Sequence, residues 1–203
     1  MRNSVLPPPF IRNFLIKLNR DIDQLSNYCP STHEETPESG ELPIHRMVLL
    51  LEDRRFFSHS GVDIWSLKRE CFRFLTLQRH GGASTIDMQL VRTITGYRER
   101  TPTRKIYEMF LARLLQYHAT KWQILNSYLS IAYFGNRLRG IEATSQKLFN
   151  KNKEDLTLEE AAELASLLVY PRPQNETPRW REKVTRRASY ALRLNTRLKK
   201  ISK

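Results

Sequence analysis

The chain has 203 residues, a formal net charge of +13 and 40% hydrophobic residues. This length can bury one sizeable core, and the composition excludes an intrinsically disordered or collagen-like protein. Apolar runs such as Met47–Leu51 are far shorter than the ~18 residues of a membrane-spanning helix. Prolines at positions 7–9 stand where a signal peptide would carry its apolar core, so we expect neither a signal peptide nor a membrane span in this sequence.

The positive charge is concentrated towards the C-terminus. Residues 172–203 contain 11 lysines and arginines and only two acidic residues. Such a segment can bind anionic lipid headgroups, a polyphosphate substrate or nucleic acid. Charge alone does not choose among these three partners.

The first predicted element is an amphipathic helix over residues 10–22. Its apolar side chains share one helical face: Ile11, Phe14, Leu15, Leu18 and Ile22. We expect this face to pack on the domain, and the alternative is a helix that lies on a membrane surface. Residues 29–43 follow as an acidic loop that contains prolines.

The rest of the chain has helical periodicity, and no segment alternates convincingly as a strand. Ser84, Thr101 and Thr157 are suitable N-cap residues, Pro102 suits a first helical turn, and Gly96 suits a helix end. We therefore predict helices over about 43–53, from about 62, and over about 84–94, 101–119, 122–129, 141–148, 157–170 and 178–200. The fold class is all-α, with at most a minor strand.

Two adjacent carboxylates, Glu52 and Asp53, end the apolar run that begins at Met47. The helix dipole and the apolar neighbours both disfavour a negative charge there, so a carboxylate in this position is suited to accept a proton. We hypothesise that Glu52 is a general base that activates a hydroxyl group. The alternative is an ordinary exposed acidic pair, and these residues alone do not decide between the two.

A second carboxylate, Glu108, lies on a predicted helix whose start is crowded by cations: Arg98, Arg100, Arg104 and Lys105. A helix N-terminus favours anions, so cations there indicate a bound partner such as phosphate or pyrophosphate. An i,i+4 ion pair between Arg104 and Glu108 is the alternative, and it leaves three cations unexplained. We therefore favour a phosphate site.

Other polar residues have structural as well as functional explanations. His59 has no second histidine at ligand spacing, so a structural histidine that fixes the loop after Glu52 is favoured over a metal ligand. Ser84 and Thr85 are most simply cap residues, although a helix N-terminus can also hold phosphate oxygens. Gln89 either bonds to a sugar or faces solvent.

Five motifs in order resemble the peptidoglycan glycosyltransferases of glycosyltransferase family 51, in their short monofunctional form. The likeness runs from about Leu50 to Leu192, and chance matches do not preserve order. The motifs are Glu-Asp-x-x-Phe-x-x-His-x-Gly at Glu52, Asp53, Phe56, His59 and Gly61, then Gly82–Leu90, Arg-Lys-x-x-Glu at Arg104, Lys105 and Glu108, Lys121–Leu129 with Phe134-Gly135, and Arg186-Arg187 with Tyr190-Ala191-Leu192.

The resemblance implies a lysozyme-like helical lobe with a smaller jaw lobe that dips into the membrane, and an enzyme that polymerises lipid II. Glu52 would deprotonate the 4-hydroxyl of the acceptor, which displaces undecaprenyl pyrophosphate from the donor with inversion. Glu108 would assist the leaving group, directly or through a divalent cation (Mg²⁺ or Mn²⁺). The resemblance further assigns Arg92, Arg104 and Lys105 to the phosphates, Asp53, Ser84 and Gln89 to the sugars, and Phe56, His59 and Thr85 to the rest of the substrate site.

The expected organisation is an N-terminal helix and acidic loop over 1–41, then a glycosyltransferase domain with a basic C-terminal helix over 42–203. Expected partners are lipid II, the growing lipid-linked glycan and an anionic membrane surface, which the basic helix and the 10–22 stripe would help to hold. No nucleic acid is expected. The family places such an enzyme peripherally at the periplasmic face of the bacterial inner membrane.

Departures from the family pattern keep alternatives open. Met88 replaces a glutamine, and Arg92-Thr93 replace the usual Lys-Asn. One alternative is a diverged, weak or inactive member that acts as a membrane- or partner-binding module. Another is a lysozyme-like hydrolase with Glu52 as general acid, which the cations near Glu108 disfavour because a neutral glycan needs no phosphate site.

Overall fold

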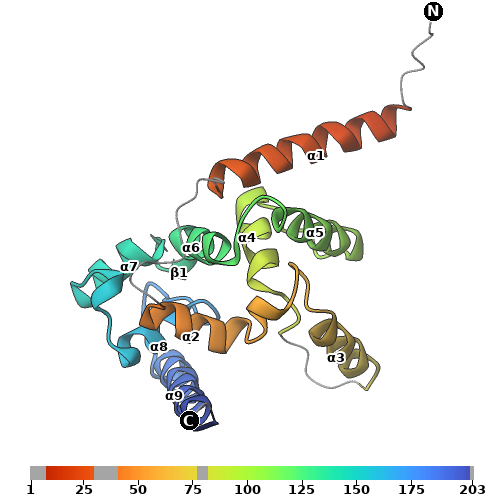
Figure 1. Ribbon diagram of the computed structural model, residues 1–203. Coiled ribbons are helices and arrows are strands. Elements are labelled where there is room, and N and C mark those ends of the chain that lie inside the picture. The colour runs from red at the N-terminus through yellow and green to blue at the C-terminus, as the bar shows by residue number, and fades with distance from the viewer. Residues whose placement is uncertain (1–7, 30–40, 77–81, 202–203) are drawn as a thin grey trace, which may run out of the picture.

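The computed structural model describes residues 8–29, 41–76 and 82–201 of the chain. These residues are mainly helical, which confirms the predicted class (Figure 1). The two short strands pair antiparallel. In chain order the elements are α1 (Pro9–Tyr28), α2 (Pro43–Glu52), the 3₁₀ turn Phe56–Ser58, α3 (Ile64–Leu75), α4 (Ile86–Thr95), α5 (Pro102–Leu115), α6 (Lys121–Ile131), β1 (Tyr133–Gly135), β2 (Leu138–Arg139), α7 (Ile141–Phe149), the 3₁₀ turn Lys153–Asp155, α8 (Leu158–Leu167) and α9 (Pro178–Ile201).

Helix starts follow the predicted capping chemistry with one correction. Thr101 caps α5 by accepting a hydrogen bond from the Arg104 amide, and Thr157 forms the predicted capping box with Glu160. Ser84, however, does not cap α4. Its neighbour Thr85 accepts the Met88 amide instead, because the Ser84 hydroxyl is turned towards a lysine of the site described below.

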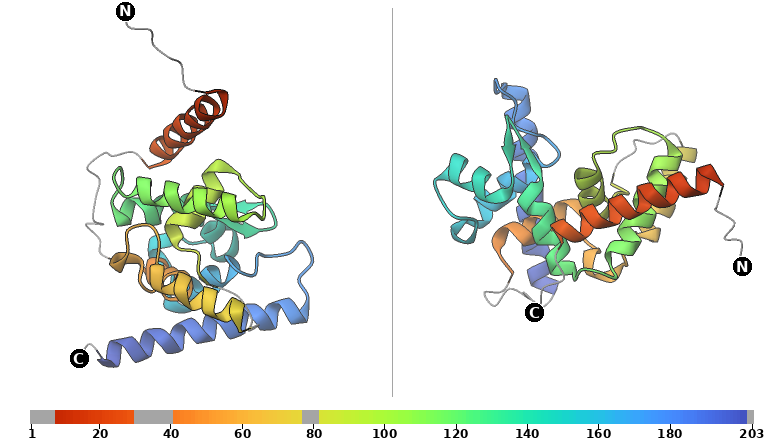
Figure 2. Two further views of the ribbon diagram at one scale, coloured as in Figure 1. Left: turned by 90° about the vertical axis from the view of Figure 1, so that its right-hand side faces the viewer. Right: turned by 90° about the horizontal axis from the view of Figure 1, so that it is seen from above.

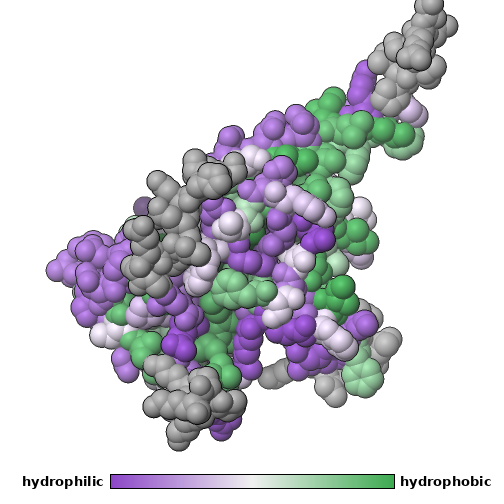
Figure 3. Space-filling view, in the orientation of Figure 1, coloured by the Kyte–Doolittle hydropathy of each residue, from purple (hydrophilic) through white to green (hydrophobic). Residues whose placement is uncertain are grey.

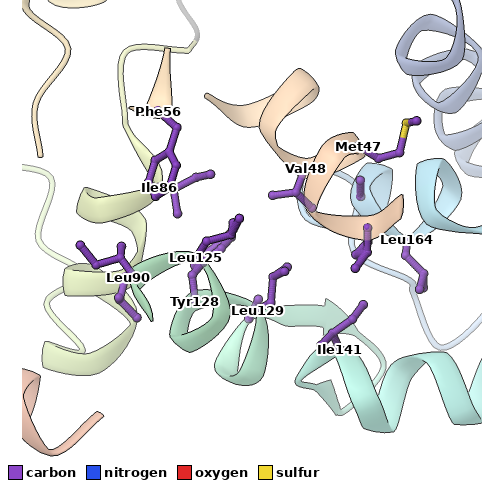
Figure 4. Packing of buried hydrophobic residues seen from close by; sticks show 14 of the residues in the cluster. Met47, Val48, Phe56, Ile86, Leu90, Leu125, Tyr128, Leu129, Ile141 and Leu164 are labelled. Carbon is purple, nitrogen blue, oxygen red and sulfur yellow. The ribbon is translucent and has the colours of Figure 1, made fainter. Parts of the chain in front are cut away.

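The core is built around α2, α4, α6 and α8. Figure 4 shows Val48 of α2 pointing towards the apolar side chains of α4 and α6, and Met47 on the other side of α2, the side of Leu164 of α8. All three of these residues are fully buried. Burying such side chains contributes about 1.5–3 kcal/mol each, so the end of α2, where Glu52 lies, is held in place by its whole apolar face.

The peripheral helices lie on different sides of this core. α9 packs against α8 and α2, and it lies on the opposite side of the domain from α1 (Figures 1 and 2). α3 stands at the edge of the molecule beyond the end of α2 (Figure 1). The predicted boundary between residues 41 and 42 stays a prediction, because most of the expected acidic loop lies outside the described residues.

The prediction that the N-terminal helix packs on the domain is correct for only half of α1. Its C-terminal half contacts α4 and α5, and Asp21 and Leu25 are buried. Its N-terminal half projects away from the domain (Figure 1), and Phe10, Leu15 and Ile16 are exposed. The apolar face continues beyond the part of the domain that supports it.

Two glycines with positive φ offer a matched test of the packing near the site. A Cβ on Gly61 would lie 2.3 Å from the Ala112 carbonyl oxygen, whereas a Cβ on Gly96 would meet nothing within 4 Å. We expect Gly96→Ala to lower the free energy of unfolding by about 1 kcal/mol, from backbone strain alone. Gly61→Ala should cost about 3 kcal/mol, since overpacking is added to the strain. Urea unfolding measures both values, and equal losses would contradict this packing.

Candidate active site

Glu52 lies at the wall of a pocket of about 400 Å³. The end of α2 and the turn after it form one side, and the segment Gly82–Thr85 leads into α4 beside it. α3 supplies the basic side chains Arg69 and Arg73. The pocket therefore combines the carboxylates of Glu52, Asp53 and Asp63 with guanidinium groups, as expected for a site that handles a polar, anionic substrate.

The carboxylate of Glu52 is held at both oxygens. Arg187 Nη2 of α9 donates to Oε1 at 2.7 Å, and Gln89 Nε2 of α4 donates to Oε2 at 3.2 Å. The Tyr128 hydroxyl donates in turn to Gln89 Oε1 at 2.8 Å. Burial, with the charge of Glu52 second, raises the pKa of Tyr128, so this hydroxyl remains a donor. These contacts orient a carboxylate whose side chain is 10% exposed.

Asp53 is a structural neighbour of Glu52 in this arrangement. Its Oδ2 atom lies 2.9 Å from His59 Nε2 and accepts the Ile86 amide at 3.2 Å. An Ile86 amide at the start of α4 has no partner inside its own helix, and a carboxylate there also suits the helix dipole. Asp53 therefore ties the end of α2 to the 56–61 loop and to α4.

Three further motif residues are enclosed in the same region. Phe56 is 1% exposed and belongs to the core, and the buried Thr85 hydroxyl donates to the Gly61 carbonyl at 2.6 Å. The side chain of His59 is 5% exposed. In this conformation Phe56, His59 and Thr85 support the loop around the pocket, and their predicted contact with substrate stays a prediction.

A second cluster surrounds Glu108, which is 3% exposed. Lys105 Nζ donates to Glu108 Oε1 at 2.9 Å and to Ser84 Oγ at 2.8 Å. Arg104 binds the other carboxylate oxygen. The pKa of Lys105 is lowered, first by burial and then by the charges of Arg92 and Arg104. The positive charges of Arg92, Arg104 and Lys105 outnumber the single negative charge of Glu108. An anion would therefore be stabilised beside these three cations.

Ser84 connects the two clusters, because it lines the pocket of Glu52 and accepts from Lys105. Glu108 itself does not line that pocket and is covered by its two cations. Arg104 Nε is a buried donor without an acceptor in the described protein. The site thus presents the Glu52 carboxylate at the pocket wall, and next to it lie cations that Glu108 orients.

Two contributors were not predicted from the sequence as site residues. Arg187 was recognised only as part of a basic motif, yet it lies on the buried face of α9 that Val184 and Ala191 define. That i, i+3, i+7 spacing was a usable signal. The other is a buried ion pair beneath the site, between Asp87 and Lys121 at 3.2 Å, in which Gln116 also donates to Asp87.

Neither carboxylate cluster offers a ready metal site. Asp53, His59 and Asp87 place ligand atoms within 4.8 Å of one another, but Lys121 already supplies the positive charge on Asp87 and His59 already contacts Asp53. At Glu108 both oxygens are bound by cationic side chains. A divalent ion would have to displace a lysine or an arginine, so the described side chains do not fit a resident metal.

Comparison with known proteins identifies relatives. A family model described as Transglycosylase matches residues 23–196. The chain is 36% identical over 184 residues to a biosynthetic peptidoglycan transglycosylase of Shewanella frigidimarina, covering 88% of this chain and 76% of that protein. It is 37% identical over 144 residues to penicillin-binding protein 1A of Neisseria gonorrhoeae, covering 70% of this chain. The chain spans only 18% of that longer relative.

The Asp87–Lys121 pair yields a stability prediction. Lys121→Met should lower the free energy of unfolding at pH 7 by about 3–5 kcal/mol, because it leaves a buried carboxylate without its counter-charge. Burial raises the pKa of Asp87, and Lys121 opposes that effect. Without Lys121 the folded pKa rises further above the unfolded value, so the protonated form is favoured in the folded state.

The stability deficit of Lys121→Met relative to the wild type should consequently be constant above the raised pKa of Asp87 in the variant, and it should narrow as the pH falls below that pKa. Urea unfolding at pH 5 and pH 7 checks this direction. Asp87→Asn/Lys121→Met, which removes both charges, is the control and should recover much of the loss. A Lys121→Met protein as stable as the wild type at pH 7 would contradict the assignment.

Proposed function

Because this chain belongs to the transglycosylase family, we propose that it is a peptidoglycan glycosyltransferase that polymerises lipid II into glycan strands. The observation that carries the proposal is the pairing of an accessible, oriented Glu52 with the Arg104–Lys105–Glu108 cluster through Ser84. A base beside an anion site is what glycosyl transfer from a pyrophosphate donor requires.

Glu52 acts as the general base in this mechanism. It takes the proton of the acceptor 4-hydroxyl as that oxygen bonds to the anomeric carbon of the donor, with inversion. The bond from the anomeric carbon to the pyrophosphate oxygen breaks, and its electron pair leaves with the lipid pyrophosphate. Arg187 and Gln89 hold the carboxylate, so little reorganisation precedes proton transfer.

The cations of α4 and α5 stabilise the leaving pyrophosphate. Lys105 and Arg104 carry the charge, Arg92 adds to it, and Glu108 fixes the two side chains in place. Donors fixed before the reaction lower the barrier most where charge develops. Since neither carboxylate cluster among the described residues offers a ready metal site, the divalent cation expected from the family is proposed to arrive bound to the pyrophosphate of the substrate. Titration of the free protein with Mg²⁺ should then show no saturable site.

The lipid-linked substrate places the enzyme at a membrane surface, and we propose the periplasmic face of the inner membrane as its location. Among the described residues, no helix has the length and apolarity to cross a bilayer. Part of the C-terminal basic charge is used within the protein, since Arg172 and Arg181 pair with Glu176.

The general base is tested by Glu52→Gln, which keeps the shape of the side chain but removes its basicity. We expect the rate of glycan formation from lipid II in detergent to fall about 10²–10⁴-fold, with an unchanged midpoint of urea unfolding. Glu159→Gln, at an exposed acid of α8, is the control and should retain full activity. Retained polymerisation in Glu52→Gln, or cleavage of purified cell walls without lipid substrate, would refute the proposal.

The pyrophosphate site is tested by Lys105→Met, which keeps the apolar stem of the side chain. We expect kcat to fall about 10²-fold because one charged donor to the leaving group is lost. Calorimetric binding of inorganic pyrophosphate to the protein should weaken in parallel. Lys147→Met, at an exposed lysine of α7, is the matched control. Unchanged pyrophosphate binding in Lys105→Met would remove this lysine from the proposed site.

A further inference from the structure

The N-terminal half of α1 exposes apolar side chains that no described part of the protein covers. Phe10 is 72% exposed and Leu15 is 50% exposed, whereas Leu25, further along the same helix, is 3% exposed. The last ring contact with the domain on this face is made by Phe14, whose ring packs edge-on against Tyr107 of α5 at 6.1 Å. Beyond Phe14 the apolar face has no partner among the described residues.

α1 is fixed at its middle by a polar contact. The buried carboxylate of Asp21 accepts from the Tyr97 hydroxyl at 2.8 Å and from the Tyr107 hydroxyl at 2.9 Å. Lys17 Nζ lies over both rings, 4.3 Å and 4.5 Å from their centroids. We call this cluster of Lys17, Asp21, Tyr97 and Tyr107 the Asp21 clamp. It sets the direction in which the uncovered half of α1 extends.

The charge of the uncovered half is positive. Pro9–Ile16 contains Arg12 and no acidic residue, and Lys17 of the Asp21 clamp follows directly. A helix with an apolar face and a basic remainder suits the boundary between acyl chains and anionic headgroups. A protein partner that recognises a helix usually also uses acidic or hydrogen-bonding side chains, and over Pro9–Ile16 the polar side chains are only Arg12 and Asn13.

The apolar surface continues from α1 onto its neighbour. Ile106 and Phe110, one turn apart on α5, are also exposed. Figure 3 shows apolar surface along α1 and down the right-hand edge of the molecule, the side on which α5 lies in Figure 1. α9, the other basic helix, lies on the opposite side of the domain (Figures 1 and 2), so we assign the lipid contact to α1.

We propose that the N-terminal half of α1 lies in the plane of an anionic lipid surface and that the Asp21 clamp holds the catalytic domain against that surface. The proposal rests on the proposed function only in that a lipid-linked substrate gives the enzyme a reason to lie there. Ile11 and Leu15 form the face that enters the lipid. Ile16 lies roughly 100–140° around the helix from both and faces the headgroups or water.

This geometry provides a matched pair of variants on one helix. In flotation with vesicles that contain phosphatidylglycerol, Ile11→Ser/Leu15→Ser should lower the partition coefficient of the full chain at least about tenfold. Ile16→Ser, at a side chain 62% exposed, should change it less than about twofold. Arg12→Gln should lower it about fivefold, and only on the anionic vesicles.

A fluorescence measurement distinguishes a lost lipid contact from a folding defect in the double variant. An environment-sensitive dye attached at Leu15→Cys should shift to the blue when phosphatidylglycerol vesicles are added, and the same dye at Ile16→Cys should not. Equal shifts at both positions would overturn the proposal. A wild-type chain that does not bind these vesicles would also overturn the proposal, as would one that dimerises through α1 without binding them.

Vesicle binding is measured on the wild-type chain and its α1 variants with vesicles that contain no lipid II, and polymerisation is measured in detergent without a bilayer. Glycan formation in detergent combined with failed flotation would remove the α1 proposal alone. Normal flotation combined with no glycan formation by the wild type would remove the proposed function alone.

Discussion

The carboxylate of Asp53 is the interaction on which the site depends. It ends α2, contacts His59 of the following loop and accepts the first free amide of α4. These three segments carry the base, the pocket wall and the helix of Gln89 and Arg92. The buried apolar face of α2 holds this helix in the core, so the Asp53 carboxylate at its end has a fixed position. Its contacts with His59 and with the Ile86 amide then fix the following loop and the start of α4 relative to α2.

The acidic residues near the site divide into two kinds by their surroundings. Asp53, Asp87 and Glu108 are buried, and each has its charge or hydrogen-bonding capacity met by protein groups. Breaking such buried pairs is costly, whereas forming them adds little stability, so their value lies in fixing geometry. Glu52 differs because its side chain, which borders the pocket, is 10% exposed, against 5% for Asp53 beside it. A proton can reach this carboxylate without dismantling the structure around it.

The sequence predicted the helices well because their signals are local. Helical periodicity, cap residues and the glycine that follows α4 are signals that act within one or two turns. They predicted the helix boundaries to within a few residues. The assignment of Ser84 as a cap was wrong because Ser84 and Thr85 are equally good cap residues. Only the position of Lys105, 21 residues away along the chain, decides between them.

Features set by tertiary contacts were beyond the sequence. The inward turn of Arg187 depends on where α9 crosses the end of α2, and the burial of Glu108 depends on its two cations folding back over it. The apolar stripe of α1 has the same pattern in its packed and its uncovered halves. Periodicity therefore could not show where support by the domain ends.

α5 is where the separate parts of the molecule meet. Leu111 and Leu115 of this helix are buried in the domain, while Lys105 extends to Ser84 and Arg104 binds Glu108. Tyr107 joins the Asp21 clamp, and Ile106 and Phe110 face outward. A rigid helix that carries all of these groups fixes the position of the cations relative to any surface that α1 contacts. The pyrophosphate of a lipid-linked substrate lies at the headgroup level, so one helix can align the anion site with its ligand.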